Sequence, residues 1–254
     1  MDIRESFNNS PSSKVICSYL GGSYSYGLYD PEKGSDRDER GIFLHLEPSK
    51  IIGLERFDHF SKQEGQDDIF YWELRHFLNL LRKGNTMAVE MLFYGNWLSI
   101  EPEFRIIQQS RLDLIDSERL FKCLMGYTYS ERELVLGKRT GQLGGKRKEA
   151  LEKYGYSYKN LVQYIRLCRA GEVFFQTGWF PVNIRPDQEV GALLWSIKTK
   201  SEDYNAEYAV ELMDKYLEKL KASFNTIKYQ FTFKDEVAND ILMRCYLPIL
   251  NSKS

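Results

Sequence analysis

Two short apolar runs near the start of the chain enclose a stretch of small and acidic residues. The runs cover residues 15–20 and 40–45. Short apolar runs bounded by turn residues are typical of buried strands. The sequence therefore predicts two strands joined by a long loop over residues 21–34. The enclosed residues that matter most for chemistry are, in chain order, Gly21, Gly22, Ser23, Asp36 and Asp38.

This stretch suits a site for a metal ion and a phosphate group. Glycine N–H groups and a serine hydroxyl donate hydrogen bonds to anions without adding bulk. Asp36 and Asp38 share one face of an extended chain, and two adjacent carboxylates repel each other unless a cation lies between them. Their hard oxygen atoms favour Mg²⁺ or Mn²⁺. A third carboxylate would complete the set, and either Asp67 or Asp68, but not both, can face it from the next strand.

The rest of the chain predicts a mixed first half and a helical second half. Residues 67–72 form a third β-type run, and residues 55–66 are polar enough to be an exposed connection. A helix should follow the third strand and end at Gly84, with a second short helix capped by Asn85. Beyond residue 116 only helical periodicity is visible, and one helix is expected to end at Gly171. The apolar stripe of the first helix consists of Leu74, Phe77, Leu78 and Leu81.

We therefore expect an α+β protein. Its first domain, residues 1–115, would contain three strands and two helices, and residues 116–254 would form a helical domain. The 254 residues are 43% hydrophobic and 28% charged, which is typical of a globular chain. The formal net charge of −1 gives no overall basic field that would indicate nucleic acid binding.

The cysteines and the apolar segments indicate the cellular compartment in which the protein would occur. The four cysteines are far apart and form no C-x-x-C pair, so structural zinc is not expected. Reduced, mostly buried thiols are typical of a cytoplasmic protein. No apolar run approaches the length of a membrane span, so no membrane partner is expected. The oligomeric state is not indicated.

Four motifs around the candidate acids resemble those of the DNA polymerase beta superfamily of nucleotidyltransferases. The most similar branch is bacterial and phage, and is proposed to act in RNA repair. Its motifs are G-S-x-x-Y-G, S-D-x-D-x-R-G, D-x-x-x-x-E-L and G-N-x-x-x-x-E-x-L. They match, in this order, residues 22–27, residues 35–41, Asp68 with Glu73 and Leu74, and Gly84 with Asn85, Glu90 and Leu92.

The resemblance implies a polymerase-beta-like palm domain followed by a helical domain, and it implies residue roles. Asp36, Asp38 and Asp68 would hold Mg²⁺ or Mn²⁺, and Asp68 is preferred to Asp67 because of its spacing to the E-L pair. Gly22 and Ser23 would bind the triphosphate of an NTP. Two roles remain open for each of two cations. Arg40 would either pair with Asp38 or contact phosphate, and Lys159 would lie either on a solvated surface or at a phosphate.

A looser match lies in the second half, at Tyr154, Gly155 and Tyr156 with Lys159 and Arg166. Asn160 and Gln163 stand where the family usually carries histidines, so no acid–base role is expected there. Glu73 and Glu90 are expected to be structural carboxylates.

The run of residues 138–148 is basic and contains no acid. We interpret it as a flexible loop that attracts phosphate, with Tyr154, Tyr156 and Tyr158 nearby to stack on bases. The alternative is an exposed loop without a partner.

The predicted activity is transfer of an NMP from an NTP, ATP among the candidates, to an acceptor hydroxyl with release of pyrophosphate. RNA is the leading acceptor. One alternative is nucleotidylation of a protein or a small molecule, and another is an inactive nucleotide-binding module.

Overall fold

The computed structural model describes residues 12–32, 35, 37–54, 57–64, 67–139 and 145–252. The chain forms two compact units. One contains residues Met1–Ser25, Tyr29–Asp116 and Phe231–Ser254, and the other contains Tyr26–Leu28 and Ser117–Gln230.

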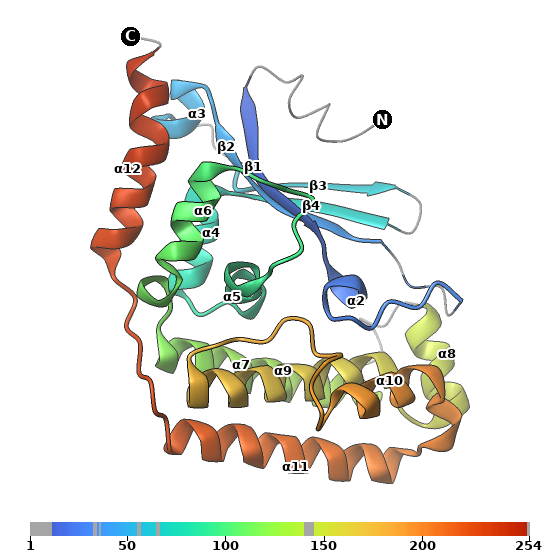
Figure 1. Ribbon diagram of the computed structural model, residues 1–254. Helices are drawn as coiled ribbons and strands as arrows, with labels where there is room; N and C mark the ends of the chain where they lie inside the picture. The colour runs from blue at the N-terminus through green and yellow to red at the C-terminus, as the bar shows by residue number, and fades with distance from the viewer. Residues whose placement is uncertain are drawn as a thin grey trace. The chain divides into compact units, whose positions relative to one another are not determined.

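The first unit is built on a mixed sheet with the strand order β3-β4-β2-β1-β5 (Figure 1). Strand β2 pairs antiparallel with β1 and parallel with β4, and β3 forms an antiparallel pair with β4. Together with its helices the sheet confirms the expected α+β class. The strands are β1 (Ser13–Leu20), β2 (Glu39–His45), β3 (His59–Glu64), β4 (Asp67–Glu73) and β5 (Ser99–Ile100).

The three strands expected from the sequence, β1, β2 and β4, are the three inner strands of this sheet. Nearly every residue of β1 is buried, as are the last five residues of β2, which accounts for their continuous apolar runs. Gly41 is required where the Tyr71 ring crosses β2, because a Cβ there would collide with that ring. The Tyr71 hydroxyl donates to the Glu39 carboxylate across the same face.

Two further strands lie where the sequence predicted none. Residues 55–66 were expected to be an exposed connection, but β3 occupies part of this segment. β3 is an edge strand whose side chains are mostly exposed, which is why its residues are mostly polar. Its sequence therefore lacks the apolar pattern from which a buried strand is predicted. Phe60 of β3 packs against the core around Phe43 and Tyr71.

The two helices expected in the first half, α4 and α5, have the expected capping residues, whereas the shorter helices α2, α3, α6 and η1 were not predicted. The Glu73 side chain accepts a hydrogen bond from the His76 N–H at 3.0 Å and caps α4, so its expected structural role is confirmed. Gly84 follows α4 with φ +77°, and Asn85 caps α5. The helices are α2 (Gly22–Ser25), α3 (Pro48–Ile52), α4 (Leu74–Arg82), α5 (Thr86–Phe93), α6 (Pro102–Gln109), the 3-10 helix η1 (Arg111–Leu114) and α12 (Asp235–Asn251).

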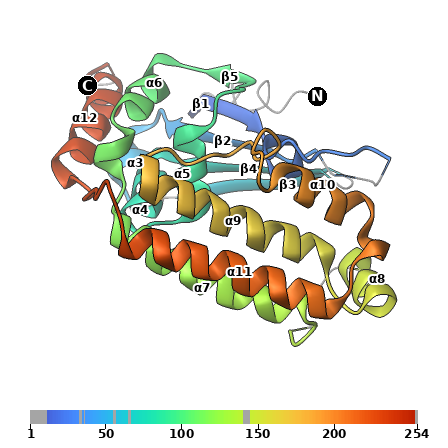
Figure 2. The ribbon, with the colours of Figure 1, turned by 60° about the horizontal axis from the view of Figure 1, so that its bottom comes forward.

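The second unit consists of helices with α9 at its centre (Figure 2). Gly171 was expected to end α9, but the helix continues to Thr177 and ends before Gly178. Gly171 lies instead at a close helix crossing, where a Cβ would be 2.6 Å from Leu124 and 2.7 Å from Leu220. The elements are α7 (Ser117–Val135), α8 (Gly145–Tyr154), α9 (Tyr158–Thr177), α10 (Gly191–Thr199), η3 (Ser201–Asp203) and α11 (Ala206–Asn225).

The division of the chain differs from the expected boundary in two places. Helix α12 was assigned to a helical domain of residues 116–254, but it packs beside α4 and α6 in the first unit (Figure 1). The Tyr246 hydroxyl donates to Glu73, which fixes α12 to the end of β4. Residues Tyr26–Leu28, which include the end of the first motif, belong to the helical unit. Both assignments depend on contacts between residues distant in sequence, which local periodicity does not report.

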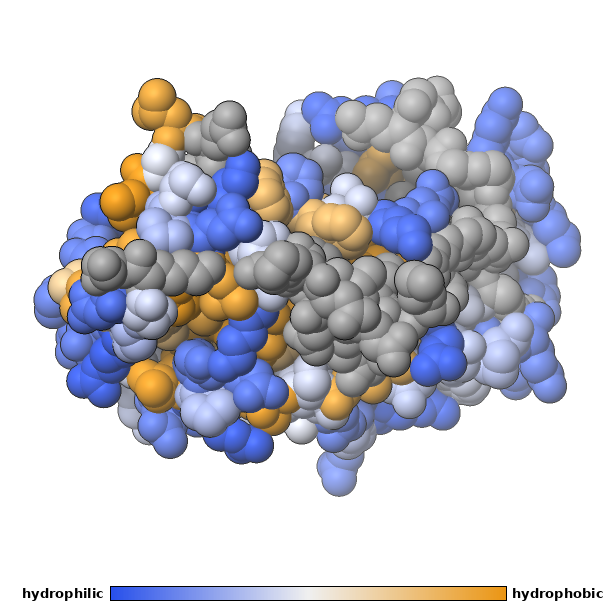
Figure 3. All heavy atoms as spheres, turned by 90° about the horizontal axis from the view of Figure 1, so that it is seen from above, coloured by the Kyte–Doolittle hydropathy of each residue, from blue (hydrophilic) through white to orange (hydrophobic). Residues whose placement is uncertain are grey.

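Exposed hydrophobic side chains lie on the side of the first unit that carries α3 and α12 (Figure 3). They include Ile52, Leu54 and Met243.

Within the described ranges no helix combines the length and the apolar character that crossing a membrane requires. Three of the four cysteines are buried, and burial raises the pKa of the Cys17 and Cys168 thiols, so these thiols stay protonated at neutral pH.

Candidate active site

The site is formed where β1 ends and where β2 and β4 begin. Leu20 lies opposite Glu39, and Glu39 lies beside Ile69. The residues just before these positions, Asp38 and Asp68, are therefore neighbours at the start of two parallel strands. The Asp68 N–H donates to Asp38 Oδ1 at 3.4 Å. The structure thus brings together two acids that are thirty residues apart in sequence.

The glycine turn after β1 closes directly over Asp38. The Gly21 N–H donates to the Asp38 carbonyl at 2.8 Å. Gly22 has φ +57°, and a Cβ at this position would lie 2.7 Å from Asp38 Oδ2. Only glycine fits both the backbone and the space beside this carboxylate. Gly22 and Ser23 then open the four-residue helix α2, whose Ser25 hydroxyl donates back to the Gly22 carbonyl.

Arg40 adopts one of its two expected roles. Its guanidinium lies 3.7 Å from Asp38 Oδ2, and both side chains are about four-fifths buried, with 19% and 22% of their surface exposed. The same guanidinium lies 5.8 Å from the centre of the Phe70 ring. Arg40 therefore partly neutralises the Asp38 carboxylate and reaches across the sheet toward β4. Contact with a phosphate remains a prediction.

The predicted metal ligands are only partly described. Asp36 lies outside the described residues, as does the side chain of Asp67. Within the described part of the chain no three His, Cys, Asp or Glu side chains converge on one point. Asp38 and Asp68 are joined through the backbone N–H of Asp68, and both carry hard carboxylate oxygens of the kind that Mg²⁺ prefers, so the chemistry of these two residues fits such an ion. The three-carboxylate site stays a prediction.

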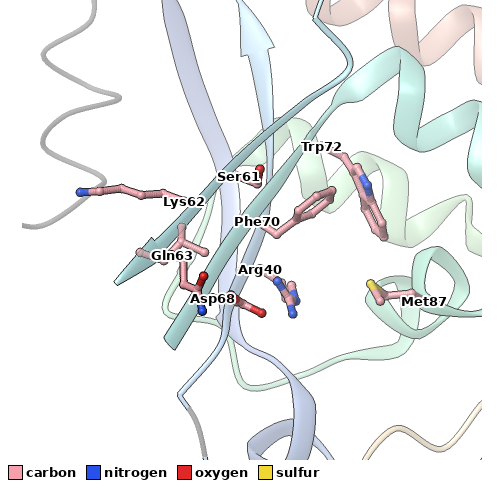
Figure 4. Close-up of a pocket in the computed structure, with 9 residues that line it drawn as sticks. Arg40, Ser61, Lys62, Gln63, Asp68, Phe70, Trp72 and Met87 are labelled. Atoms are coloured by element: carbon pink, nitrogen blue, oxygen red, sulfur yellow. The ribbon is translucent and has the colours of Figure 1, made fainter. Parts of the chain in front are cut away.

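A cavity of about 450 Å³ adjoins Asp68 (Figure 4). It lies over β2, β4 and β3 on the face that carries Arg40 and Asp68. Figure 4 shows Phe70 and Trp72 directed toward Met87 of α5, with Lys62 pointing away. This cavity was not predicted from the sequence, because Ser61 and Gln63 line it from β3, a strand that the sequence did not predict.

Comparisons with known proteins agree with this geometry. The family model described as RlaP, the RNA repair pathway DNA polymerase beta family, matches residues 3–225. The chain belongs to this family. It is therefore a nucleotidyltransferase, as the motifs predicted.

Two other comparisons add little. No curated protein matches the chain. A solved structure of a nucleotidyltransferase-like protein from Exiguobacterium sibiricum 255-15 is 11% identical, with 97% of this chain and 78% of that chain covered. Its TM-score with this chain is 0.31.

In this member of the RNA repair pathway DNA polymerase beta family, the second-half motif lies in the helical unit. Lys159 is in the first turn of α9 and half-buried. Asn160, which replaces a histidine of the family pattern, is buried and donates to Glu131 at 2.7 Å. Arg166 is fully buried with its guanidinium 3.6 Å from the centre of the Tyr26 ring. The contact between Arg166 and Tyr26 joins the second-half motif to the first motif inside one unit.

The basic run is described only in part. Residues 140–144 and the side chains of residues 145–147 lie outside the described part of the chain. The run is not wholly a loop, because α8 begins at Gly145. Tyr156 was expected to be available for stacking, but it is fully buried and its hydroxyl donates to the Ser201 carbonyl at 3.0 Å. Binding of RNA by this run remains a prediction.

Proposed function

We propose that this nucleotidyltransferase transfers an NMP from an NTP to a hydroxyl at the end of an RNA. The observation that carries the proposal is the meeting of Asp38 and Asp68 beside the Gly21–Gly22 turn. Nucleotidyl transfer needs carboxylates for metal ions next to donors for the phosphates. The family description supports RNA as the acceptor.

Each residue of the site would have a separate task. Asp36, Asp38 and Asp68 would hold Mg²⁺ or Mn²⁺, which neutralises phosphate charge and makes the acceptor hydroxyl more acidic. Gly22 and Ser23 would bind the phosphates of the NTP through their N–H groups. Arg40, now paired with Asp38, would turn toward a phosphate oxygen when the nucleotide binds. Lys159 is proposed as a further phosphate contact.

The reaction forms one bond and breaks one. The acceptor hydroxyl oxygen attacks the α-phosphorus, and the bond from that phosphorus to the oxygen bridging to the β-phosphorus breaks. Pyrophosphate leaves with the electron pair of that bond. Asp68 would lie at the acceptor side of Asp38 and would take the hydroxyl proton. Most of the rate enhancement would come from positioning and charge neutralisation.

The test uses α-labelled NTPs, Mg²⁺ and a pool of RNAs. We expect the wild-type protein to label RNA, and chelation by EDTA to abolish the labelling until Mg²⁺ or Mn²⁺ is restored. Asp38→Asn and Asp68→Asn should each lower the rate by about 10²-fold or more, because each removes a charge that orients the reacting groups. Asp36→Ala should do the same.

Asp240→Asn is the matched control, since Asp240 forms an exposed pair with Arg244 on α12. Its rate should equal that of the wild type. Bound NTP without any labelled product would overturn the enzymatic proposal. Label in protein or in a small molecule, with none in RNA, would overturn the choice of acceptor. Equal labelling by Asp36→Ala and the wild type would remove Asp36 from the site.

A further inference from the structure

The cavity over β4 has the chemistry of a nucleobase site. Its volume of about 450 Å³ lies in the range of small-ligand pockets, roughly 300–1,000 Å³. Phe70 and Trp72 supply aromatic surface, and Ser61 and Gln63 supply hydrogen-bonding groups at the β3 edge (Figure 4). Met87, which is 41% exposed on α5, faces them. An aromatic wall with a few polar groups is the usual way in which proteins hold an unpaired base.

The Phe70 ring is held in place from two sides. His59 of β3 stacks on it, with ring centres 5.3 Å apart and an interplanar angle of 14°. Trp72 meets it edge-on with ring centres 5.6 Å apart. Arg40 approaches from β2. His59 covers the ring from β3, and the face over which Arg40 lies would become a stacking surface when Arg40 turns toward a phosphate. Because the ring is already fixed, its ordering would cost little when a ligand binds.

The strand order indicates which of the two substrates, the NTP or the acceptor, would lie next to the cavity. Across the sheet, the glycine turn follows β1, Asp38 precedes β2, Asp68 is the second residue of β4, and β3 lies beyond. The cavity extends from Arg40 of β2 across β4 to β3, and so lies away from β1, whose glycine turn would hold the phosphates. Asp68 and Phe70 share one face of β4 two residues apart, about 6.6 Å along the strand. A ribose would bridge from a base on Phe70 to a hydroxyl at Asp68.

We propose that this cavity binds the terminal base of the acceptor strand and so delivers its hydroxyl to Asp68. The proposal rests on the function proposed above and names the part of the RNA that the site recognises. Stacking is tolerant of base identity, so the cavity should accept an unpaired end of any sequence better than an end without a base. Phe70 is a positioning residue in this scheme, not a catalytic one.

The test compares two fluorescein-labelled single-stranded RNAs, one intact and one with an abasic 3′-terminal nucleotide that keeps its hydroxyls. Binding is measured by anisotropy with Mg²⁺, and the KM values for RNA and NTP are measured by label transfer. Loss of the terminal base should weaken binding to the wild-type protein about tenfold. Phe70→Leu should weaken binding of the intact RNA by a similar factor and leave the abasic RNA and the KM for NTP unchanged.

Two variants serve as controls. Phe70→Tyr keeps an aromatic face and should bind as the wild type does. Tyr129→Leu removes an exposed aromatic side chain of α7 and should change nothing. A Phe70→Leu effect that is equal for both RNAs would overturn the proposal, as would an effect on the KM for NTP alone.

The two proposals fail in different ways. Binding that depends on the terminal base, without any transfer of label, would support the cavity as a base site and overturn the proposed transfer to RNA. Transfer to both RNAs with equal KM, unaffected by Phe70→Leu, would support the proposed function and overturn this inference.

Discussion

At the scale of single residues, the first motif is explained by contacts that differ from one position to the next. Gly22 makes room for the Asp38 carboxylate, and Gly41 makes room for the Tyr71 ring. Tyr26 is covered by the Arg166 guanidinium, and its carbonyl accepts from the Ile184 N–H at 3.1 Å. One motif therefore serves the candidate active site with its first residues and packing in the helical unit with its later ones.

Gly22→Ala tests the first of these contacts. The new Cβ would displace the Asp38 carboxylate, and a misplacement of about 1 Å can cost about 10²-fold in rate. The positive φ adds about 1–2 kcal/mol of strain. We expect a large loss of transfer activity with a smaller loss of stability, measured by turnover and by urea unfolding. Gly95→Ala is the control, because nothing lies within 4 Å of a Cβ there. Equal turnover of the two variants would contradict the expectation.

His45 makes stability depend on pH. Burial lowers its pKa below 6.5, and nearby Lys50 and Arg75 act in the same direction, while the hydrogen bond with the Phe57 carbonyl and the charge of Glu73 act against it. The unfolded chain therefore takes up a proton near pH 6.5 that the folded chain does not. Stability from this group is complete above that pH and is lost as the pH falls through the lowered pKa. His45→Leu should flatten the dependence of Tm on pH between about 7.5 and 5.5. Parallel Tm curves would contradict this.

At the scale of elements, helix α12 is fixed to the sheet through the buried hydroxyl of Tyr246. The Tyr246 hydroxyl donates to the same Glu73 carboxylate that caps α4. Burial and the Glu73 charge raise the pKa of Tyr246, so it stays a neutral donor at physiological pH. The start of α12 is held by Lys234, whose ammonium lies 2.7 Å from Asp113 Oδ1.

Tyr246→Phe should lower the free energy of unfolding by about 1–3 kcal/mol, because it leaves a buried carboxylate oxygen without its donor. Chemical unfolding followed by circular dichroism measures this. Tyr229→Phe, at a half-exposed position of the helical unit, should leave the free energy of unfolding unchanged. If the two variants are equally stable, Tyr246 does not fix α12.

At the scale of the whole molecule, the sheet unit is assembled from both ends of the chain. Removal of residues 231–254 should destabilise this unit, although it leaves every predicted site residue in place. Helix α12 buries Ala238, Ile241, Cys245 and Tyr246. Burial of a large side chain contributes about 1.5–3 kcal/mol to the free energy of unfolding, and the total for a protein is about 5–15 kcal/mol. Loss of several such side chains therefore removes a large part of the stability.

We therefore expect a chain ending at residue 230 to lose protection from hydrogen exchange in β1, β2 and β4. A chain ending at residue 252 is the control and should retain it. Unchanged protection in the shorter chain would show that α12 is dispensable for the sheet.

The sequence by itself determined the inner strands, the caps of α4 and α5 and the pairing of a glycine turn with Asp38. These features are local, because apolar runs, capping residues and turn glycines act on their own neighbours. The tertiary structure decided that Asp68 meets Asp38, since this depends on the parallel pairing of β2 with β4. It also decided that the polar residues of β3 form an edge strand, that α12 packs in the sheet unit, and that α9 continues beyond Gly171. Each of these features depends on which residues distant in sequence pack together. The periodicity of one segment does not indicate which other segment packs against it.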